Sequence, residues 1–278
     1  MSSLDISRYR VSGGQFSLSS IDPGDVQGWK KREGKHRFKE NRKAIIDIQE
    51  RLYAESKQSL LFVFQAMDAG GKDSTIGALC KGVNPQGCRV SSFKAPSKEE
   101  LAHDFLWRVH AQTPRKGMIR IYNRSHYEDV LIVKVHGWAS PEMTENRYRH
   151  INDFEKLLCD HGTRIVKVML HISPEYQLRQ FRDRLVEEKK WWKFNPDDLS
   201  ERERWSDYMD AFEIALNRCS TDYAPWYVVP SEHKWFRLLV VSQLMRDALE
   251  EMDPSYPEPG FDPKEWNPER LDAYANPE

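Results

Sequence analysis

Residues 59–75 of the chain read SLLFVFQAMDAGGKDST. Residues 60–64 form an unbroken apolar run rich in aromatic and β-branched side chains, which predicts a strand buried on both faces, as in a parallel sheet. Residues 66–72 then place two adjacent glycines and Lys72 before a helix, where backbone N–H groups and a lysine can bind phosphate. We therefore predict a phosphate-binding loop between a central strand and a helix.

This loop departs from the pattern G-x-x-x-x-G-K-[ST] at two positions. Ala66 replaces the first glycine, and Asp73 stands where a hydroxyl residue normally binds Mg²⁺. Asp68, inside the loop, becomes the expected oxygen ligand for the metal. The alternative is a strand, a glycine turn and a helix without a ligand, but their order along the chain favours phosphate binding. The expected phosphate contacts from the loop and the following turn are Ala69, Gly70, Gly71, Asp73 and Ser74.

Composition limits the class of protein. The chain has 278 residues, and its 42 Lys and Arg residues nearly balance 43 Asp and Glu residues, so no overall field attracts polyanions. The four cysteines form no C-x-x-C pair, which argues against zinc and against a disulfide framework. No apolar run approaches the roughly 18 residues that span a bilayer, and the first ten residues lack a signal-peptide core. We expect a cytoplasmic protein without nucleic-acid or membrane partners.

The remaining chain alternates between strand and helix patterns. Residues 1–34 predict an extended N-terminal arm, 35–252 one α/β domain, and 253–278 an irregular tail. This alternation predicts a doubly wound, three-layer, five-stranded parallel sheet with ligands at the carboxyl ends of its strands. The expected strands are 60–64, 88–93, 117–122, 163–172 and 226–229. The expected helices are 35–57, 73–82, 97–110, 142–161, one from 173, and 232–250.

A second polar cluster, Asn123 to Asp129, follows the third strand. An arginine at a strand end can hold phosphate with its planar fork, and Asn123 can hydrogen-bond the same group without adding charge. Because the carboxyl ends of parallel strands meet at one edge, Arg124 should face the same cleft as Lys72. The alternative is that Arg124 only pairs with Glu128 or Asp129 on a helix surface.

A third cluster is basic and lies at about residues 182–200. A mobile cover here would exclude water and bring positive charge to phosphate oxygens. The alternative is a solvated helix, since basic runs are commonly only surface. The basic residues of this region and of the turn before it are Arg179, Arg182, Arg184, Lys189, Lys190 and Lys193.

Several separate motifs occur in an order that resembles the polyphosphate kinase 2 family. They are QAMDAGGKD at 65–73, GVNPQG at 82–87, SFKAP at 92–96, HDFLWR at 103–108 and NRSHYEDVL at 123–131. The likeness covers about residues 35–250. It implies a P-loop kinase fold similar to thymidylate kinase, with a helical basic lid. It also implies reversible phosphoryl transfer between inorganic polyphosphate and purine nucleotides with Mg²⁺, or with Mn²⁺ in its place.

The resemblance also implies roles for individual residues. Asp68, Lys72, Arg124 and Arg182 become catalytic, with Asp68 as the metal ligand. Lys134 and Lys193 become further phosphate-binding residues, and Arg120 becomes another candidate for a polyphosphate channel. Nucleotide binding falls to Asn123, Arg124, Tyr127 and Glu128. An Asn at position 123 is similar to the third class of the family, which phosphorylates both AMP and ADP.

Two rival functions share parts of this pattern. An ATP-dependent nucleoside monophosphate kinase would have the loop, the strand-end arginine and the lid, but Asp73 after the loop lysine speaks against it. A non-catalytic regulator that binds polyphosphate or nucleotide would retain the cleft, but Asp68, Lys72 and Arg124 together speak against loss of turnover. We expect a homo-oligomer, either a dimer or a tetramer.

Overall fold

The structure, a computed structural model, describes residues 4–12 and 14–275. Its centre is the predicted five-stranded, entirely parallel sheet, and the strands lie in the order β2-β3-β1-β4-β5. The phosphate-loop strand β1 therefore lies in the middle, where neighbouring strands cover both of its edges. The strands are β1 (Ser59–Gln65), β2 (Cys88–Ser92), β3 (Ile119–Asn123), β4 (Thr163–His171) and β5 (Trp226–Pro230).

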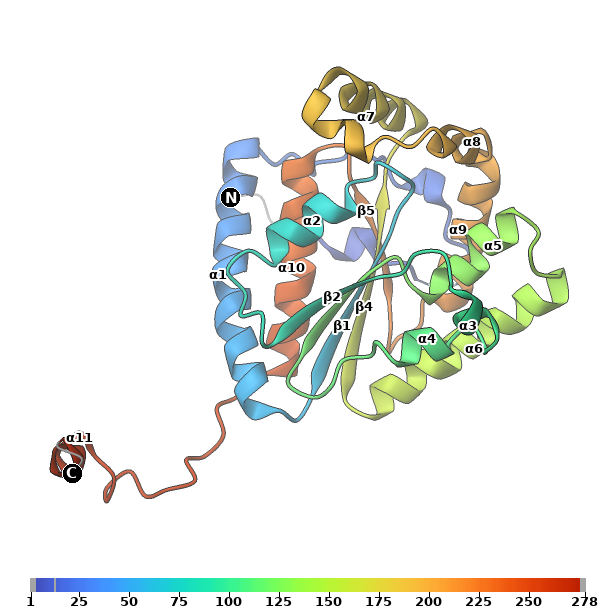
Figure 1. The fold of residues 1–278 in the computed structure, drawn as a ribbon. Coiled ribbons are helices and arrows are strands. Elements are labelled where there is room, and N and C mark those ends of the chain that lie inside the picture. The colour runs from blue at the N-terminus through green and yellow to red at the C-terminus, as the bar shows by residue number, and fades with distance from the viewer. Residues whose placement is uncertain (1–3, 13, 276–278) are drawn as a thin grey trace.

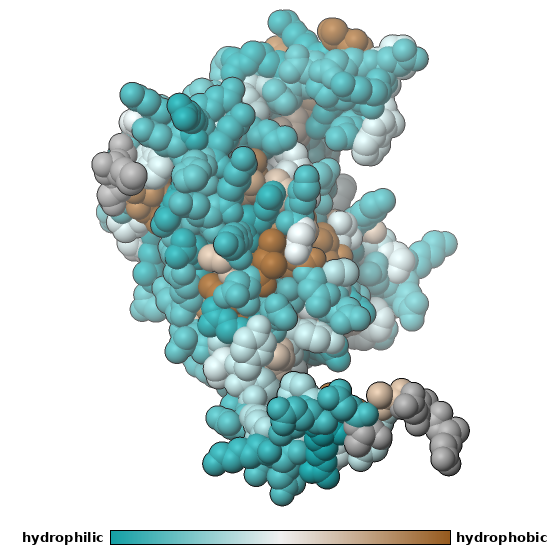
Figure 2. All heavy atoms as spheres, turned by 90° about the vertical axis from the view of Figure 1, so that its left-hand side faces the viewer, coloured by the Kyte–Doolittle hydropathy of each residue, from teal (hydrophilic) through white to brown (hydrophobic). Residues whose placement is uncertain are grey.

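Helices cover both faces of the sheet and complete the three layers (Figure 1). One face packs against α1 (Lys31–Glu55), α2 (Lys72–Leu79) and α10 (Lys234–Met252). The other packs against α6 (Pro141–Asp160) and α9 (Trp205–Cys219). Surface on the α1 side is largely hydrophilic, with the main group of apolar side chains near its middle (Figure 2).

Shorter helices complete the chain. Those between β2 and α6 are α3 (Lys98–Leu101), α4 (Trp107–His110), η3 (His126–Val130) and α5 (Ile132–Val135). Three elements lie beyond the carboxyl end of the sheet: α7 (Pro174–Val186), η4 (Glu188–Lys193) and α8 (Asp197–Glu203). The terminal segments contain η1 (Ser7–Tyr9), η2 (Leu18–Ser20), α11 (Pro268–Leu271) and η5 (Asp272–Tyr274).

The side chains of β1 divide between two hydrophobic cores. Leu60 and Phe62 point toward α1 and α10, whereas Leu61 and Val63 point toward α6 and α9. All four are fully buried. A strand that is apolar at every position is stable only when both faces of its sheet are covered. The layers therefore fix β1, and with it the start of the phosphate loop.

The structure differs from the sequence-based prediction in two segments. The helix predicted over 97–110 is instead two short helices, although its predicted cap forms, with Ser97 Oγ accepting from Glu100 N at 3.2 Å. Helix α9 was not predicted, although its pattern is amphipathic and it covers one face of the sheet together with α6. The cluster of lysines and arginines that precedes α9 predicts a mobile cover over the cleft and gives no signal for a core helix after it.

The N-terminal arm lies on the domain. Val11 N donates to Trp226 O at 2.9 Å beside β5, and Tyr9 and Val11 are buried. Beyond α10 the tail runs away from the body of the molecule (Figure 1). The predicted arm and tail also include residues 1–3, 13 and 276–278, which lie outside the described residues. None of the helices within the described ranges has the length and apolar content needed to cross a membrane.

A buried ionic network anchors η3, the turn that follows β3. Lys167 Nζ pairs with Glu155 and donates to Tyr127 Oη at 2.9 Å, while Tyr127 Oη donates to Glu155 Oε1 at 2.9 Å. His126 Nε2 lies 3.1 Å from the same carboxylate. All four side chains are fully buried, so each charge has its partners in the core. The network fixes the segment that begins with Arg124.

Candidate active site

A cleft of about 770 Å³ opens at the carboxyl ends of β1, β2 and β3. Five parts of the chain line it: the phosphate loop, the turns after β2 and β3, the α7–η4 region, and the first turn of α10. Its position matches the rule that ligands of doubly wound sheets bind where the strands end. The charged residues on its wall are Asp68, Lys72, Asp73, Lys94, Arg124, Asp183, Arg184, Lys190, Lys193, Lys234 and Arg237.

The phosphate loop folds tightly around Lys72. Gly70 N donates to Met67 O at 3.0 Å, and Gly71 adopts a φ of +94° just before α2 begins. Lys72 Nζ donates to Ala66 O at 2.9 Å, so the lysine spans the loop from beneath. Burial lowers the pKa of Lys72, and Asp68 acts against that effect. A bound phosphate would supply further negative charge and favour the charged lysine.

Arg237, from α10, supports the loop from the other side. Its guanidinium donates to Ser231 O at 2.9 Å, to Ser74 Oγ at 3.1 Å and to Gly70 O at 3.3 Å. A Cβ at Gly71 would lie 2.4 Å from Arg237 Nη1, so only glycine allows this approach. The side chain is 2% exposed. A buried cation therefore lies directly against the backbone that is expected to hold phosphate.

Arg124 joins the strand end to the loop. Its Nη2 donates to Asp68 Oδ1 at 2.9 Å, and its Nη1 lies 3.8 Å from Glu128 Oε2. Burial opposes its charge, but Glu128 and Asp68 outweigh that effect and raise the pKa of Arg124. Its φ of +61° is rare for a residue with a side chain, and such strain commonly occurs at functional sites. The structure thus brings Asp68, Lys72 and Arg124 to one cleft, as the sequence predicts.

Asn123 contacts the residue that replaces the usual hydroxyl. Its Nδ2 donates to Asp73 Oδ1 at 2.7 Å across the mouth of the cleft. Both side chains are polar and accessible, and the amide leaves the pair with a single negative charge. This contact links the end of β3 to the first turn of α2. The two residues are 50 positions apart, so local sequence does not reveal their contact.

Comparison with known proteins identifies the family. The family model described as polyphosphate kinase 2 matches residues 28–257. The chain belongs to the polyphosphate kinase 2 family. It is 45% identical to an AMP/ADP-polyphosphate phosphotransferase of Meiothermus ruber, across 91% of this chain and 96% of that protein. An ADP-polyphosphate phosphotransferase of Rhodopseudomonas palustris is 41% identical, across 90% and 93%.

A solved structure supports the fold. Polyphosphate kinase 2 from Arthrobacter aurescens superposes with a TM-score of 0.91 at 42% identity, covering 96% of this chain and 95% of that one. The three-layer α/β architecture with a phosphate loop is thus the fold of this polyphosphate kinase 2 protein. The family assignment also makes the chain a kinase.

The basic region after β4 places Arg184, Lys190 and Lys193 in the cleft, but not Arg182, the residue predicted to be catalytic. Arg182 is exposed on α7 and does not line the cleft. Arg184 does, and it donates to Asp198 Oδ2 and to Lys193 O, each at 3.0 Å. Lys190 and Lys193 line the cleft as well, because η4 turns back over it. On a helix, positions 182 and 184 point to different sides, and the sequence did not show which side faces the cleft.

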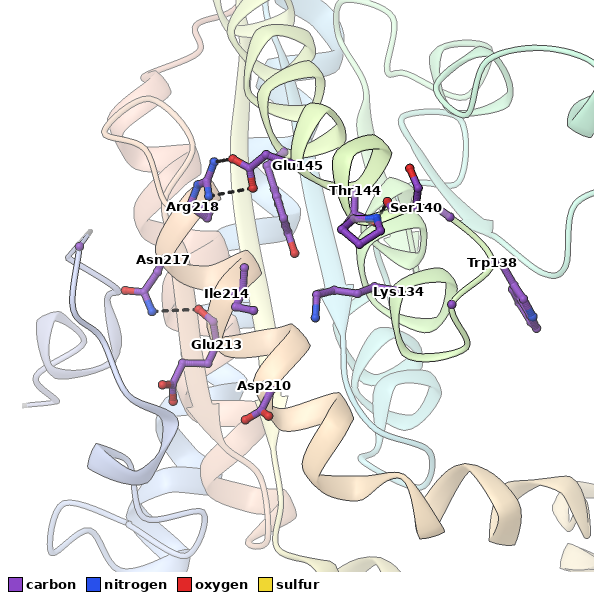
Figure 3. Close-up of a pocket in the computed structure, with 15 residues that line it drawn as sticks. Lys134, Trp138, Ser140, Thr144, Glu145, Asp210, Glu213, Ile214, Asn217 and Arg218 are labelled. Carbon is purple, nitrogen blue, oxygen red and sulfur yellow. Dashed lines mark hydrogen bonds and ion pairs between the residues drawn. The ribbon is translucent and has the colours of Figure 1, made fainter.

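Two predicted ligand residues lie elsewhere. The side chain of Tyr127 is fully buried in the network with Glu155 and Lys167, so it does not reach the cleft. Lys134, on α5, lines a separate hollow of about 1120 Å³ beside α9, where its side chain extends toward Asp210 and Glu213 (Figure 3).

Glu128 is near Arg124 and Lys72, and burial raises its pKa. Arg120, on β3, donates to Ser91 Oγ of the neighbouring strand β2 at 3.2 Å.

Three basic residues of the cleft were missed: Lys94, Lys234 and Arg237. Lys94 follows β2, and the other two follow β5 in the first turn of α10. The strand-end rule that selected Arg124 applies equally to these positions. After β2 and β5, however, the sequence shows single basic residues instead of a dense polar cluster.

The cleft suits a metal that takes most of its ligands from phosphate and water. Within the described part of the chain, no three His, Cys, Asp or Glu side chains are grouped to hold a metal by themselves. One oxygen of Asp68 is engaged by Arg124, which leaves the other free of protein hydrogen bonds among those described. Mg²⁺ sites in phosphoryl-transfer enzymes commonly use one or two carboxylates together with substrate phosphates. The donor set around Asp68 fits that chemistry.

Proposed function

We propose that this polyphosphate kinase 2 protein transfers phosphoryl groups from inorganic polyphosphate to AMP and ADP, reversibly and with Mg²⁺. One observation carries the proposal: a single cleft holds an anion-binding loop with Lys72 and, opposite it, Arg124 at 2.9 Å from the loop residue Asp68. Two phosphate groups can therefore be held facing each other. The names of the relatives in Meiothermus ruber and Rhodopseudomonas palustris support the donor and the acceptors.

The reaction follows from positioning and electrostatics. A phosphoryl group of the donor lies against the Gly70–Gly71 backbone and Lys72, and Arg124 holds the acceptor phosphate in line with it. The attacking oxygen is already anionic, so no general base is required. Arg184, Lys190 and Lys193 add positive charge and exclude water from above. Mg²⁺ held near Asp68, with Mn²⁺ as its substitute, would neutralise charge on the bridging phosphate oxygens.

The donor is the first point to test. We expect purified protein with Mg²⁺ and AMP to form ADP and then ATP when polyphosphate is supplied, because the cleft joins an anion loop to several flexible cations. The measurement is nucleotide product over time with either polyphosphate or ATP as donor. Turnover with ATP alone would instead establish a nucleoside monophosphate kinase, and no turnover with either donor would favour a binding protein.

Acceptor choice is predicted to depend on Asn123. Asn123→Asp would replace the amide that now donates to Asp73 Oδ1 at 2.7 Å with a second carboxylate. At an effective dielectric near 20, two carboxylates this close repel each other by several kcal/mol. We expect kcat/KM to fall more for AMP than for ADP. AMP presents its single phosphate beside the new charge, whereas ADP can keep its reacting end over the loop. The measurement is kcat/KM for both acceptors with polyphosphate in excess.

A double variant provides the control for this prediction. Asp73→Asn together with Asn123→Asp restores a single negative charge to the pair, so the ratio of AMP to ADP use should return toward that of the wild type. An unchanged ratio in Asn123→Asp, or a shift toward AMP, would show that this contact does not govern acceptor choice.

The cellular setting and the assembly also belong to the proposal. The four cysteines are free, as is usual for proteins of reducing compartments, which supports a cytoplasmic enzyme. The homo-oligomer expected from the sequence, a dimer or a tetramer, stays a prediction that the mass of the purified protein in solution would test.

A further inference from the structure

A row of exposed lysines begins beside the cleft and runs down α1. We call Lys31, Lys35, Lys39 and Lys43 the lysine strip. They recur every fourth residue and all four are exposed. A step of four residues turns only about 40° around a helix, so the strip winds slowly over roughly 18 Å. Within the part of the chain that the structure describes, no salt bridge involves any of these lysines. Their charges are available to a ligand.

The strip is continuous with the cleft. Lys234 lines the cleft beside the phosphate loop, and it also lines a neighbouring hollow of about 730 Å³ with Lys31, Lys35 and Trp235. Lys39 continues the same surface along the helix. Close packing fixes this arrangement, because a Cβ at Gly34 would lie 2.5 Å from the Trp235 ring. Helices α1 and α10 run side by side from the cleft end of the molecule (Figure 1).

The charge of this surface contrasts with that of the whole chain. Residues 30–43 contain eight Lys or Arg and two Glu, whereas the complete protein has a net charge of -1. Glu40 is already paired with His36 and Arg37. Glu232, the acidic residue of the hollow, contacts Arg179 at 3.6 Å and accepts from Ser173 N at 3.2 Å. The largely hydrophilic face around α1 suits a solvated polyanion (Figure 2).

We infer that the lysine strip binds the part of a polyphosphate chain that extends out of the cleft. The inference rests on the proposed function, since it takes polyphosphate as the donor. A chain whose reacting end lies against Gly71 passes Lys234 and reaches Lys31 as it leaves the site. Contacts with exposed charges are individually weak, so the strip acts through the number of phosphates it holds at once. Longer donors should therefore bind better than short ones.

A second exit from the cleft passes over β2, where Arg89, Arg108 and Arg120 line another hollow. Two of these arginines are already engaged. Arg108 donates to Lys94 O at 2.9 Å and lies 3.7 Å from Glu100, while Arg120 donates to Ser91 Oγ. The strip offers four lysines in a row that no described salt bridge engages, and the β2 side offers Arg89 and Lys94. The balance of available charge favours α1.

The test compares a strip variant with a matched control. The strip variant changes Lys31, Lys35, Lys39 and Lys43 to Gln, which keeps helix propensity. The control changes four other exposed lysines to Gln, namely Lys57, Lys81, Lys116 and Lys264, and so removes the same charge. Thermal melting checks that both variants fold. We measure kcat/KM for AMP phosphorylation with a size-fractionated series of linear polyphosphates, from the shortest chain that supports turnover upward.

In the strip variant, kcat/KM should fall about tenfold more with the longest chains than with the shortest, and its decrease with added salt should become shallower. The control should keep the wild-type dependence on chain length and salt. Equal losses at all lengths in the strip variant, or the same result in both variants, would overturn the inference. So would loss of the length dependence in Arg89→Gln. Failure of the wild type to use any polyphosphate would instead overturn the proposed function.

Discussion

Lys72→Ala is expected to lower kcat/KM for polyphosphate-dependent phosphorylation of AMP by at least about 100-fold, a loss of about 2.7 kcal/mol in transition-state stabilisation. Lys72 is the buried cation of the loop, and its ammonium lies 2.9 Å from Ala66 O, where it also helps to hold the loop closed. Removing it deprives the transferred phosphoryl group of its fixed positive charge. Steady-state kinetics with saturating AMP measures the effect.

Lys72→Met separates charge from packing. Methionine keeps an unbranched apolar stem in the same buried space, so the protein should melt close to the wild-type temperature while the loss of activity matches that of alanine. A near-normal rate in Lys72→Met would mean that the donor phosphate is held elsewhere. A rate lost only in the alanine variant would point to collapse of the loop instead of loss of charge.

Asp68→Asn is expected to reduce turnover by a similar factor, about 100-fold. Asn has the same shape and can still meet Arg124, now 2.9 Å from Asp68 Oδ1, but it removes the charge that suits Mg²⁺. The Mg²⁺ concentration that gives half-maximal rate should rise together with the loss of kcat. Both quantities come from rate measurements over a Mg²⁺ titration.

Asp198→Asn is the matched comparison for Asp68→Asn. Asp198 also pairs with an arginine, at 3.0 Å from Arg184, but it is not among the residues that line the cleft. Its loss should cost less than about tenfold, as expected for one partly exposed ion pair at the rim, without a change in the Mg²⁺ requirement. Equal effects of the two substitutions would remove the special role assigned to Asp68.

The sequence was sufficient where local pattern and fold topology agree. The apolar run of β1, the Gly70–Gly71 pair and Lys72 each have one straightforward structural reading, and a parallel sheet then places Arg124 at the same edge. All five strands were found: β1 and β4 because buried parallel strands are strongly apolar, and the largely exposed edge strand β2 because its side chains alternate. These features depend on short segments whose neighbours are decided by topology.

The sequence was insufficient where a role depends on which way a side chain turns. Arg182 and Arg184 are two residues apart on α7, and only the packing of that helix shows that Arg184 faces the cleft. Tyr127 follows the strand end closely, yet it turns inward because Lys167 and Glu155 need a partner in the core. Neither contact has a signature in local sequence, since the partners come from distant elements.

Arg237, which lies 167 positions later in the chain than Gly70, donates to the carbonyl oxygen of Gly70 in the phosphate loop. During synthesis, the β1 strand and the loop leave the ribosome long before α10 does, so the growing chain lacks this support for most of translation. The loop acquires its complete set of hydrogen bonds only after nearly the whole domain has emerged. A nascent chain that ends before α10 would thus carry the phosphate-binding motif without the hydrogen bonds from Arg237. Such a chain should bind substrate more weakly than the complete, folded protein.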